Sequence, residues 1–221
     1  MVLKIAHKGA SKYAPENTLE AFNKATKLNV DIVEFDVHLT KDKKVVIMHD
    51  HNIKNATGES GWIKNLTLKE LKKFHEPNGE SVPMLQEVID ILRKYVICKI
   101  DIKDKSMHKY ILKIIKNNKL KNVIITCDYH SVIGEIKKSN PEIKCAVGGV
   151  RDKSVKKAIR DALRVKADII DANYLIVTKK LIDEAHKNGL EINAWTVDDL
   201  KTIKKLKKLG VDAITSNSAW S

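Results

Sequence analysis

Strand-like runs alternate with amphipathic, helix-like runs along almost the whole chain of 221 residues. We expect eight strands, at residues 3–7, 31–37, 95–103, 122–128, 144–149, 167–174, 191–197 and 212–217. Apolar residues three and four positions apart predict helices at 17–29, 85–95, 108–118, 131–140, 155–165, 178–189 and 198–210. Parallel strands need crossovers of a dozen or more residues, which these helices supply. The alternation therefore predicts an α/β protein, a closed (β/α)8 TIM barrel whose last helix is reduced to a stub in "SAWS".

One apolar run breaks the alternation. The run "VVIMHD" at residues 45–50 follows the second strand after only "TKDKK", which is too short for a crossover helix. A short polar turn between apolar runs indicates an antiparallel hairpin, so we expect an arm that returns His49 to the level of Asp36. Residues 51–84 then lack clear periodicity, and long insertions are often lids or binding loops. We expect one domain, residues 1–221, with a small cap insertion at about 51–84 over the site.

The charge balance raises the question of a nucleic-acid partner. Lys and Arg number 41 against 28 Asp and Glu, for a net charge of +13. The lysines fall mainly on predicted helix faces, as in "LKTIKKLKKLG", and we find neither an aromatic–basic groove pattern nor a helix-turn-helix signature. We therefore expect a lysine-rich solvated surface and no nucleic-acid partner, with a positive field that helps to attract anionic substrates.

The apolar runs and the cysteines bear on the location of the protein. No apolar run approaches 18 residues, so we expect no membrane span and no stable membrane anchor. The start "MVLKIAHKGA" lacks the features of a signal peptide. Cys98, Cys127 and Cys145 are far apart and lie in apolar runs, which favours reduced, buried thiols in the cytoplasm. The sequence leaves open whether the protein is a monomer or a homodimer.

Two strands carry charged residues at alternate positions. In "DIVEFDVH" Glu34 and Asp36 share one face, and in "ICKIDIK" Asp101 shares a face with Lys99 and Lys103. Catalytic residues of barrels come from the carboxyl-terminal ends of several strands, so we expect the three acids to converge. Carboxylates that are pushed together repel one another unless a positive group lies between them, and their hard oxygens suit Mg²⁺ or Ca²⁺.

Two histidines end separate apolar runs, His7 at the end of the first strand and His49 in the arm. Either one alone could be a core histidine with a hydrogen-bond partner, and an acid alone could pair with a lysine such as Lys99. Two histidines, three carboxylates and two lysines are, however, all expected at the same mouth of the barrel. This agreement favours a catalytic site over separate structural roles.

Several motifs follow one another in a fixed order: "HKGASKYAPENTLEAFNKA", "VEFDVHLTKDKKVVIMHD", "TGESGWIKNLTLKEL" with "VPMLQEVID", "KIDIK", and "NAWTVDDLKTIKKLKKLGVDAITSN". In this order and spacing they resemble the glycerophosphodiester phosphodiesterase family. That family's pattern has His-Arg-Gly, Pro-Glu-Asn-Thr, an acid-x-acid strand, a Thr-Lys-Asp turn, a His-Asp arm, a cap insertion, a Glu-x-Lys strand, Trp-Thr and Gly-Val-Asp. The resemblance spans essentially the whole chain, and its most specific motifs lie in residues 7–103.

The resemblance implies a role for each matching residue. Glu34, Asp36 and Asp101 would bind one divalent cation, Mg²⁺ or Ca²⁺, which also holds phosphodiester oxygens. The other implied roles are a general acid–base pair, His7 and His49; contacts to the substrate phosphate, Lys8 and Lys103; and a contact to the glycerol or head group, Trp195, which could equally be barrel packing. The implied reaction is hydrolysis of a small glycerophosphodiester to an alcohol and glycerol 3-phosphate. Water or the substrate's own glycerol hydroxyl, through a cyclic phosphate, would attack.

The chain departs from the family pattern at three places. Lys8 replaces an arginine and so exchanges a bidentate fork for a point charge. Asp101 replaces a glutamate and is shorter by one methylene. The ending "TSNSAW" lacks the usual Thr-Asp-x-Pro. We expect the first two changes to alter metal affinity or rate without abolishing activity, because the charge type is kept at both positions.

Two other functions remain open at this stage. A lysophospholipase D-type enzyme, acting on a single-chain lipid, would need an apolar groove in the insertion. The apolar residues available there are Ile53, Trp62, Ile63, Leu66, Leu68, Leu71 and Phe74. A catalytically inactive homologue that binds phosphorylated ligands is the second alternative, and the presence of both histidines and all three carboxylates argues against it.

Overall fold

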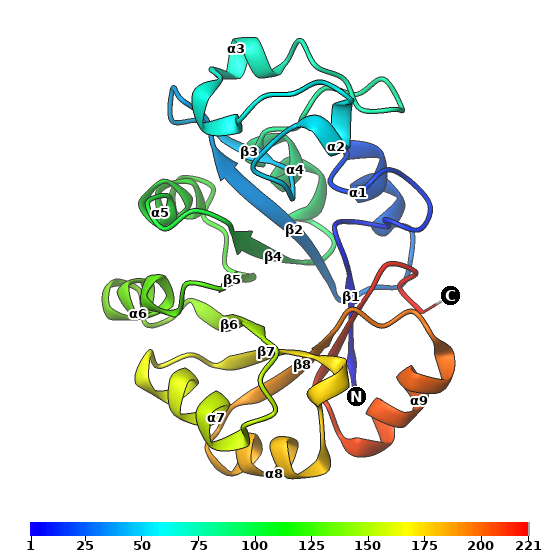
Figure 1. Ribbon diagram of the computed structural model, residues 1–221, viewed down its shortest axis with the longest axis vertical. Helices are drawn as coiled ribbons and strands as arrows, with labels where there is room; N and C mark the ends of the chain where they lie inside the picture. The colour runs from blue at the N-terminus through cyan, green and yellow to red at the C-terminus, as the bar shows by residue number, and fades with distance from the viewer. Residues whose placement is uncertain (221) are drawn as a thin grey trace.

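The computed structural model describes residues 1–220 and contains a closed ring of eight parallel strands (Figure 1). The ring strands are β1 Leu3–Ala6, β2 Ile32–Leu39, β4 Ile97–Ile102, β5 Val123–Cys127, β6 Lys144–Val150, β7 Ile169–Asn173, β8 Glu191–Trp195 and β9 Ala213–Ser216. The ring closes because β1 pairs in parallel with both β2 and β9. The predicted TIM barrel is therefore confirmed.

Helices surround the ring and cover the outer faces of its strands (Figure 1). They are α1 Leu19–Ala25, α4 Leu85–Leu92, α5 His108–Asn117, α6 His130–Ser139, α7 Val155–Arg164, α8 Lys179–Lys187 and α9 Leu200–Leu209, and a 3₁₀ turn, η2 Tyr174–Ile176, precedes α8. Thr18 and Thr178 cap α1 and α8 through their side-chain oxygens, as Ser and Thr commonly do. The expected last helix in "SAWS" does not form within the described residues, because 219–220 form a turn.

The run that breaks the alternation forms the predicted hairpin arm. Strand β3, Val45–Ile47, lies outside the ring and pairs with β2 in antiparallel register, with Val37 opposite Ile47. The backbone N–H of Met48 donates to the carbonyl of Asp36 at 3.1 Å. The next residue, His49, therefore returns to the level of Asp36, as expected.

The insertion after this arm folds around an apolar cluster of its own. Its short elements are α2 Lys54–Thr57, the 3₁₀ turn η1 Ile63–Asn65 and α3 Leu68–Leu71. The buried members of the cluster are Val46, Met48, Ile53, Ile63, Leu71 and Val82. In Figure 1 the insertion lies to one side of the barrel, beyond β2 and β3. Because Val46 belongs to β3, this packing fixes the insertion to the strand that leads to His49.

The inside of the barrel is layered from apolar to polar. The layer toward the amino-terminal ends of the strands consists of Ile5, Ile32, Ile124, Ala146, Ile169 and Ala213. Above it, the Nζ of Lys99 lies 2.7 Å from Oδ1 of Asp171, which also accepts from Asn193 at 2.8 Å. Thr126 donates to the other oxygen of Asp171 at 2.7 Å. These buried polar groups satisfy one another and form a rigid floor for the mouth of the barrel.

Candidate active site

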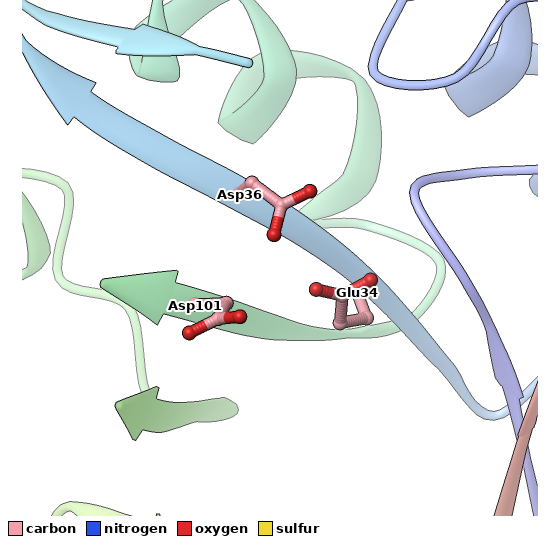
Figure 2. A group of neighbouring side chains, drawn as sticks. All are labelled: Glu34, Asp36 and Asp101. Atoms are coloured by element: carbon pink, nitrogen blue, oxygen red, sulfur yellow. The ribbon is translucent and has the colours of Figure 1, made fainter. Parts of the chain in front are cut away.

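Three carboxylates meet at the carboxyl-terminal mouth of the barrel (Figure 2). Glu34 and Asp36 project from β2, and Asp101 projects from β4, where the strand register places it directly beside Asp36. One carboxylate oxygen from each residue lies within 4.8 Å of the others. Glu34 is 5% exposed and Asp36 is 1% exposed. The convergence that strand parity predicts is therefore present.

A single lysine balances part of this negative charge. The Nζ of Lys103 lies 2.9 Å from Oδ1 of Asp36 and 2.6 Å from Oδ2 of Asp101. Burial, together with the charges of the other two acids, raises the pKa of Glu34 well above its ordinary value. Burial also raises the pKa of Asp101 to about 6, while for Asp36 the nearby charges of Lys103 and His49 outweigh burial and lower the pKa. Three hard-oxygen donors with one ammonium among them fit a divalent cation.

Backbone and amide groups hold the carboxylates in place. The N–H of Lys8 donates to Glu34 at 2.9 Å, and the side-chain amide of Asn17 donates to Asp36 at 2.9 Å. Gly9 has φ +80°, and a Cβ at this position would lie 2.9 Å from the backbone of Ala21 in α1. The "HKG" turn therefore needs a glycine. The role of Asn17 was missed, because the sequence indicated a helix start and not a contact to an acid.

His7 follows β1, and a chain of hydrogen bonds orients its ring. Its Nδ1 lies 2.7 Å from Oδ1 of Asn217, whose Nδ2 donates to Asp198 at 2.6 Å. Because the amide oxygen faces the ring, Nδ1 carries the proton and Nε2 is left with a free lone pair. Burial lowers the pKa of His7, which favours the neutral imidazole near pH 7. The arrangement suits a proton acceptor.

His49 lies at the end of the arm and has a carboxylate partner. Its Nδ1 is 2.8 Å from Oδ1 of Asp50. His38 Nε2 donates to the carbonyl of His49 at 3.0 Å, and burial lowers the pKa of His38 to about 4, so that its ring stays neutral. His38 therefore positions the arm. The adjacent acid leaves His49 Nε2 available to a substrate.

A cavity of about 120 Å³ lies at this mouth. Its lining contains seven of the eight residues that the sequence indicates, namely His7, Glu34, Asp36, His49, Asp101, Lys103 and Trp195. The remaining lining residues are Lys99, Thr126, Asp128, Gly148, Gly149, Arg151, Asp171, Asn193 and Thr215. Residues from strands far apart in sequence thus share one polar cavity.

Lys8 is the exception among the expected site residues. Its Nζ lies 2.9 Å from both carboxylate oxygens of Glu16, and it does not line the cavity. Arg151, which follows β6, lies over the ring of Trp195 at 5.0 Å and does line the cavity. The sequence reasoning missed Arg151, although an arginine just beyond a barrel strand was a usable signal. Its planar guanidinium can bind an anion through two nitrogens.

A second missed residue, Asp128, follows β5 and lines the same cavity. It packs closely on two glycines of β6. A Cβ at Gly148 would lie 2.6 Å from Oδ1 of Asp128, and a Cβ at Gly149 would lie 2.7 Å from its Cγ. Any larger residue at either glycine would therefore collide with Asp128, so the close packing of β6 against Asp128 requires the "GG" pair.

The insertion borders the mouth on the His49 side. No described residue of 51–84 lines the cavity. Ile53, Ile63 and Leu71 are at most 1% exposed, since they pack into the insertion's own cluster. Trp62 is 51% exposed. These apolar residues, which a lipid groove would require, mostly stabilise the insertion itself.

The closed barrel and the polar cavity at its carboxyl-terminal mouth define a TIM-barrel enzyme. A family model described as "Glycerophosphoryl diester phosphodiesterase family" matches residues 7–219. The chain belongs to this family, as the resemblance of its motifs implies. The expectation that the protein is an enzyme of this family is confirmed.

Individual relatives agree with the family match. A glycerophosphodiester phosphodiesterase of Caldanaerobacter subterraneus is 34% identical over 229 residues, which cover 97% of this chain and 93% of that protein. The structure of an Oleispira antarctica phosphodiesterase in complex with the product sn-glycerol-3-phosphate has a TM-score of 0.90 at 23% identity, and shares the fold over 98% of this chain and 93% of that one. Human lysophospholipase D GDPD1 is 35% identical over 99 residues, which cover 39% of this chain and 32% of that protein. Within the described residues, no helix is long and apolar enough to cross a membrane.

Proposed function

We propose that the protein hydrolyses glycerophosphodiesters to an alcohol and glycerol 3-phosphate. The observation that carries the proposal is one cavity that holds the three converging carboxylates, the lysine between Asp36 and Asp101, and two imidazoles, each imidazole held by its own polar partner. The substrate class is supported by the name of the Caldanaerobacter relative and by the product held in the Oleispira structure.

The acidic cluster is the proposed cation site. Glu34, Asp36 and Asp101 would hold one divalent ion, and Mg²⁺ and Ca²⁺ both suit such oxygen donors. When bound, the ion would neutralise charge on the phosphodiester oxygens. Lys103 adds a second positive charge beside them, and electrostatic stabilisation of this kind usually contributes most to the acceleration of the reaction.

The two histidines are the proposed acid–base pair. His7 Nε2 accepts the proton of the attacking hydroxyl while that oxygen forms a bond to phosphorus. His49 donates a proton to the alcohol oxygen as its bond to phosphorus breaks. An alkoxide is a poor leaving group near neutral pH, and each such transfer contributes about 10²–10⁴-fold. Water and the substrate's own glycerol hydroxyl are the two candidate nucleophiles, and trapping a cyclic phosphate would distinguish them.

The substrate contacts extend to the opposite wall of the cavity. Trp195 is proposed to contact the glycerol portion, and Lys8 is retained as a proposed phosphate contact that must first leave Glu16. The described structure contains no ion pair for Arg151, which already lies over Trp195 in the cavity. We therefore add Arg151 as an anion contact beside the expected residues.

A lysophospholipase D-type activity is the second candidate, and the partial match to the human enzyme favours it. The burial of Ile53, Ile63 and Leu71 argues against it, because these side chains already pack against one another. The other alternative is an inactive homologue, which would bind a phosphorylated ligand without turning it over.

One assay separates these functions. The purified protein is incubated with glycerophosphocholine, lysophosphatidylcholine or bis(p-nitrophenyl) phosphate, each with Mg²⁺, Ca²⁺ or EDTA. We expect turnover of the first substrate that EDTA abolishes. Faster turnover of the lipid would support the second candidate, and ligand binding without turnover would support the inactive homologue. Salt-sensitive DNA binding in place of turnover would contradict the expectation of no nucleic-acid partner.

The setting of the enzyme is also a proposal. Cys98, Cys127 and Cys145 are free and buried, which agrees with a reducing cytoplasm. Residues of a single chain line the cavity described above, so hydrolysis of a small diester requires no partner chain. We therefore propose that the protein is a monomer or a homodimer. Light scattering would distinguish these two states.

A further inference from the structure

A second cavity, of about 230 Å³, lies next to the active site. It is bounded by the loop before α1, the end of the arm and the insertion, and its lining residues are Pro15, Glu16, Asn17, Met48, His49, Asp50, Asn55, Ala56, Glu76 and Pro77. His49 lines both cavities, and Asn17, whose amide holds Asp36, lines this one. A group attached to the oxygen that His49 protonates can therefore extend into this space.

Two of the three acids that line this cavity have partners. Glu16 accepts from the ammonium of Lys8 at 2.9 Å. Asp50 contacts His49 through one oxygen and accepts from Asn55 through the other, at 2.6 Å. The carboxylates of Glu16 and Asp50 are thus already engaged by other groups of the protein.

The third acid, Glu76, has no such partner. It is only 8% exposed, and within the described residues its side chain makes no hydrogen bond or ion pair. Nearby Glu80, in contrast, accepts from the N–H groups of Leu19 and Glu20 at the start of α1. Burial, together with Glu16 and Glu80, raises the pKa of Glu76 to about 7. A largely buried carboxylate without a protein partner is costly to ionise, and a cation in the cavity would lower this cost.

The lining indicates which kind of cation fits. No Phe, Tyr or Trp lines the cavity within the described residues, so the ring faces that commonly bind quaternary ammonium groups are absent. A primary ammonium has three N–H donors and therefore suits carboxylate and amide oxygens. Glu76 offers such a carboxylate, and Asn55, whose N–H donates to Asp50, offers an amide oxygen.

We infer that this cavity is the subsite for the leaving alcohol and that Glu76 selects alcohols with a primary ammonium, as in glycerophosphoethanolamine. The inference rests on the proposed function, since it places the alcohol on the His49 side of the phosphate. The subsite acts by binding: the ammonium donates to Glu76 while the diester lies between the two cavities. A neutral alcohol can donate a hydrogen bond to this carboxylate but adds no opposite charge, and a quaternary ammonium group brings the charge but no N–H donor.

The test compares kcat/KM for glycerophosphoethanolamine, glycerophosphocholine and glycerophosphoglycerol in the full-length protein. We expect the primary ammonium substrate to be preferred over the neutral one by about 10- to 100-fold, the range of one charge-assisted hydrogen bond. Glu76→Gln should remove most of this preference, mainly through KM, and Glu76→Asp should restore part of it. Glu59→Gln, an exposed acid of the same insertion outside the cavity, should keep the preference.

The outcomes separate this inference from the proposed function. If none of the three substrates is turned over, the proposed function fails. If all three are turned over at similar kcat/KM, the function stands and the subsite inference is overturned. An equal loss on all substrates in Glu76→Gln, with an unchanged ratio between them, would also overturn it, since that loss would reflect only structure. Thermal melting of each variant confirms that it is folded.

Discussion

At the residue scale, the contact between His7 and Asn217 joins positions 210 apart in the chain. The amide oxygen fixes which ring nitrogen carries the proton but adds no formal charge, and burial then keeps the pKa of His7 low. The protonation state of the proposed base is thus set by a residue at the other end of the sequence. A carboxylate in place of this amide would stabilise the imidazolium.

We predict that Asn217→Asp raises the pKa of His7. Because a general base works in its neutral form, the acidic limb of the kcat/KM profile should move to higher pH. The measurement is a pH–rate profile from pH 5 to 9, and Asn65→Asp, an exposed amide-to-acid change in the insertion, is the matched control. An unshifted limb in Asn217→Asp would argue against His7 as the base.

Glu76 gives a second prediction, on stability. Its pKa is about 7 in the folded protein against an ordinary value of 4.5, so the folded state binds this proton more tightly. The contribution of Glu76 to stability is therefore full below pH 4.5 and is lost as the pH rises through about 7. The charged groups that face Glu76 are Glu16 and Glu80, and Asp50 and His49 line the same cavity.

Glu76→Gln should accordingly raise the Tm at pH 8 and change it little at pH 4.5. A chain of this size gains about 2–4 °C for each kcal/mol recovered. Differential scanning calorimetry at the two pH values measures this, with Glu59→Gln as the control. A lower Tm at pH 8 would show that Glu76 has a stabilising partner and would weaken its assignment to a ligand.

At the scale of elements, the hairpin arm and the insertion act together. Strand β3 carries His49 toward the mouth, while Val46 of the same strand packs into the insertion's cluster. Gly9 and the β6 glycines similarly permit close approach of elements that carry His7 and Asp128. The insertion thus stabilises the arm that holds His49, in addition to bordering the second cavity.

Leu71→Ala tests this coupling. Leu71 is fully buried in the insertion's cluster, so its truncation should lower the free energy of unfolding by about 2–5 kcal/mol. Activity should fall as well, because the packing beneath β3 loosens. Urea denaturation and kcat/KM are measured beside Trp62→Ala, which alters a side chain that is 51% exposed. If Leu71→Ala and Trp62→Ala lost stability and activity equally, the buried cluster would not be what supports the arm.

At the scale of the whole molecule, the barrel brings acids from two strands together and has one lysine to balance them. The surplus negative charge in the cavity contrasts with a net charge of +13 for the chain. The fold therefore carries an electrostatic cost at its mouth that a bound divalent cation would offset. Binding of such an ion to the folded state alone must stabilise the protein.

We predict that Mg²⁺ or Ca²⁺ raises the Tm and that EDTA reverses the rise. At 100 times the dissociation constant the gain is about 2.7 kcal/mol, or roughly 5–11 °C for a chain of this size. Asp101→Asn should reduce the gain, while Asp183→Asn, on the exposed face of α8, should keep it. A Tm that does not respond to either ion would contradict the proposed cation site.

Much of the architecture could be predicted because it follows from local pattern. Residues two apart on a strand share a face, so Glu34 and Asp36 had to point the same way, and a short polar turn could only return the chain. The pairing of side chains across the barrel was harder to predict from the sequence. Lys99 shares a strand face with Asp101 but pairs with Asp171, because that acid lies on the facing strand β7 at the same depth.

The sequence by itself determined the barrel, the hairpin arm and the set of acids and histidines at the mouth, because strand and helix periodicities act over a few residues. Only the tertiary structure decided that Lys8 pairs with Glu16, that Arg151 enters the cavity and that Glu76 is buried without a partner. These outcomes depend on distances between segments far apart in the chain, and periodicity carries no information about such distances. Partner choice among charged side chains is therefore settled by packing and desolvation in the folded molecule.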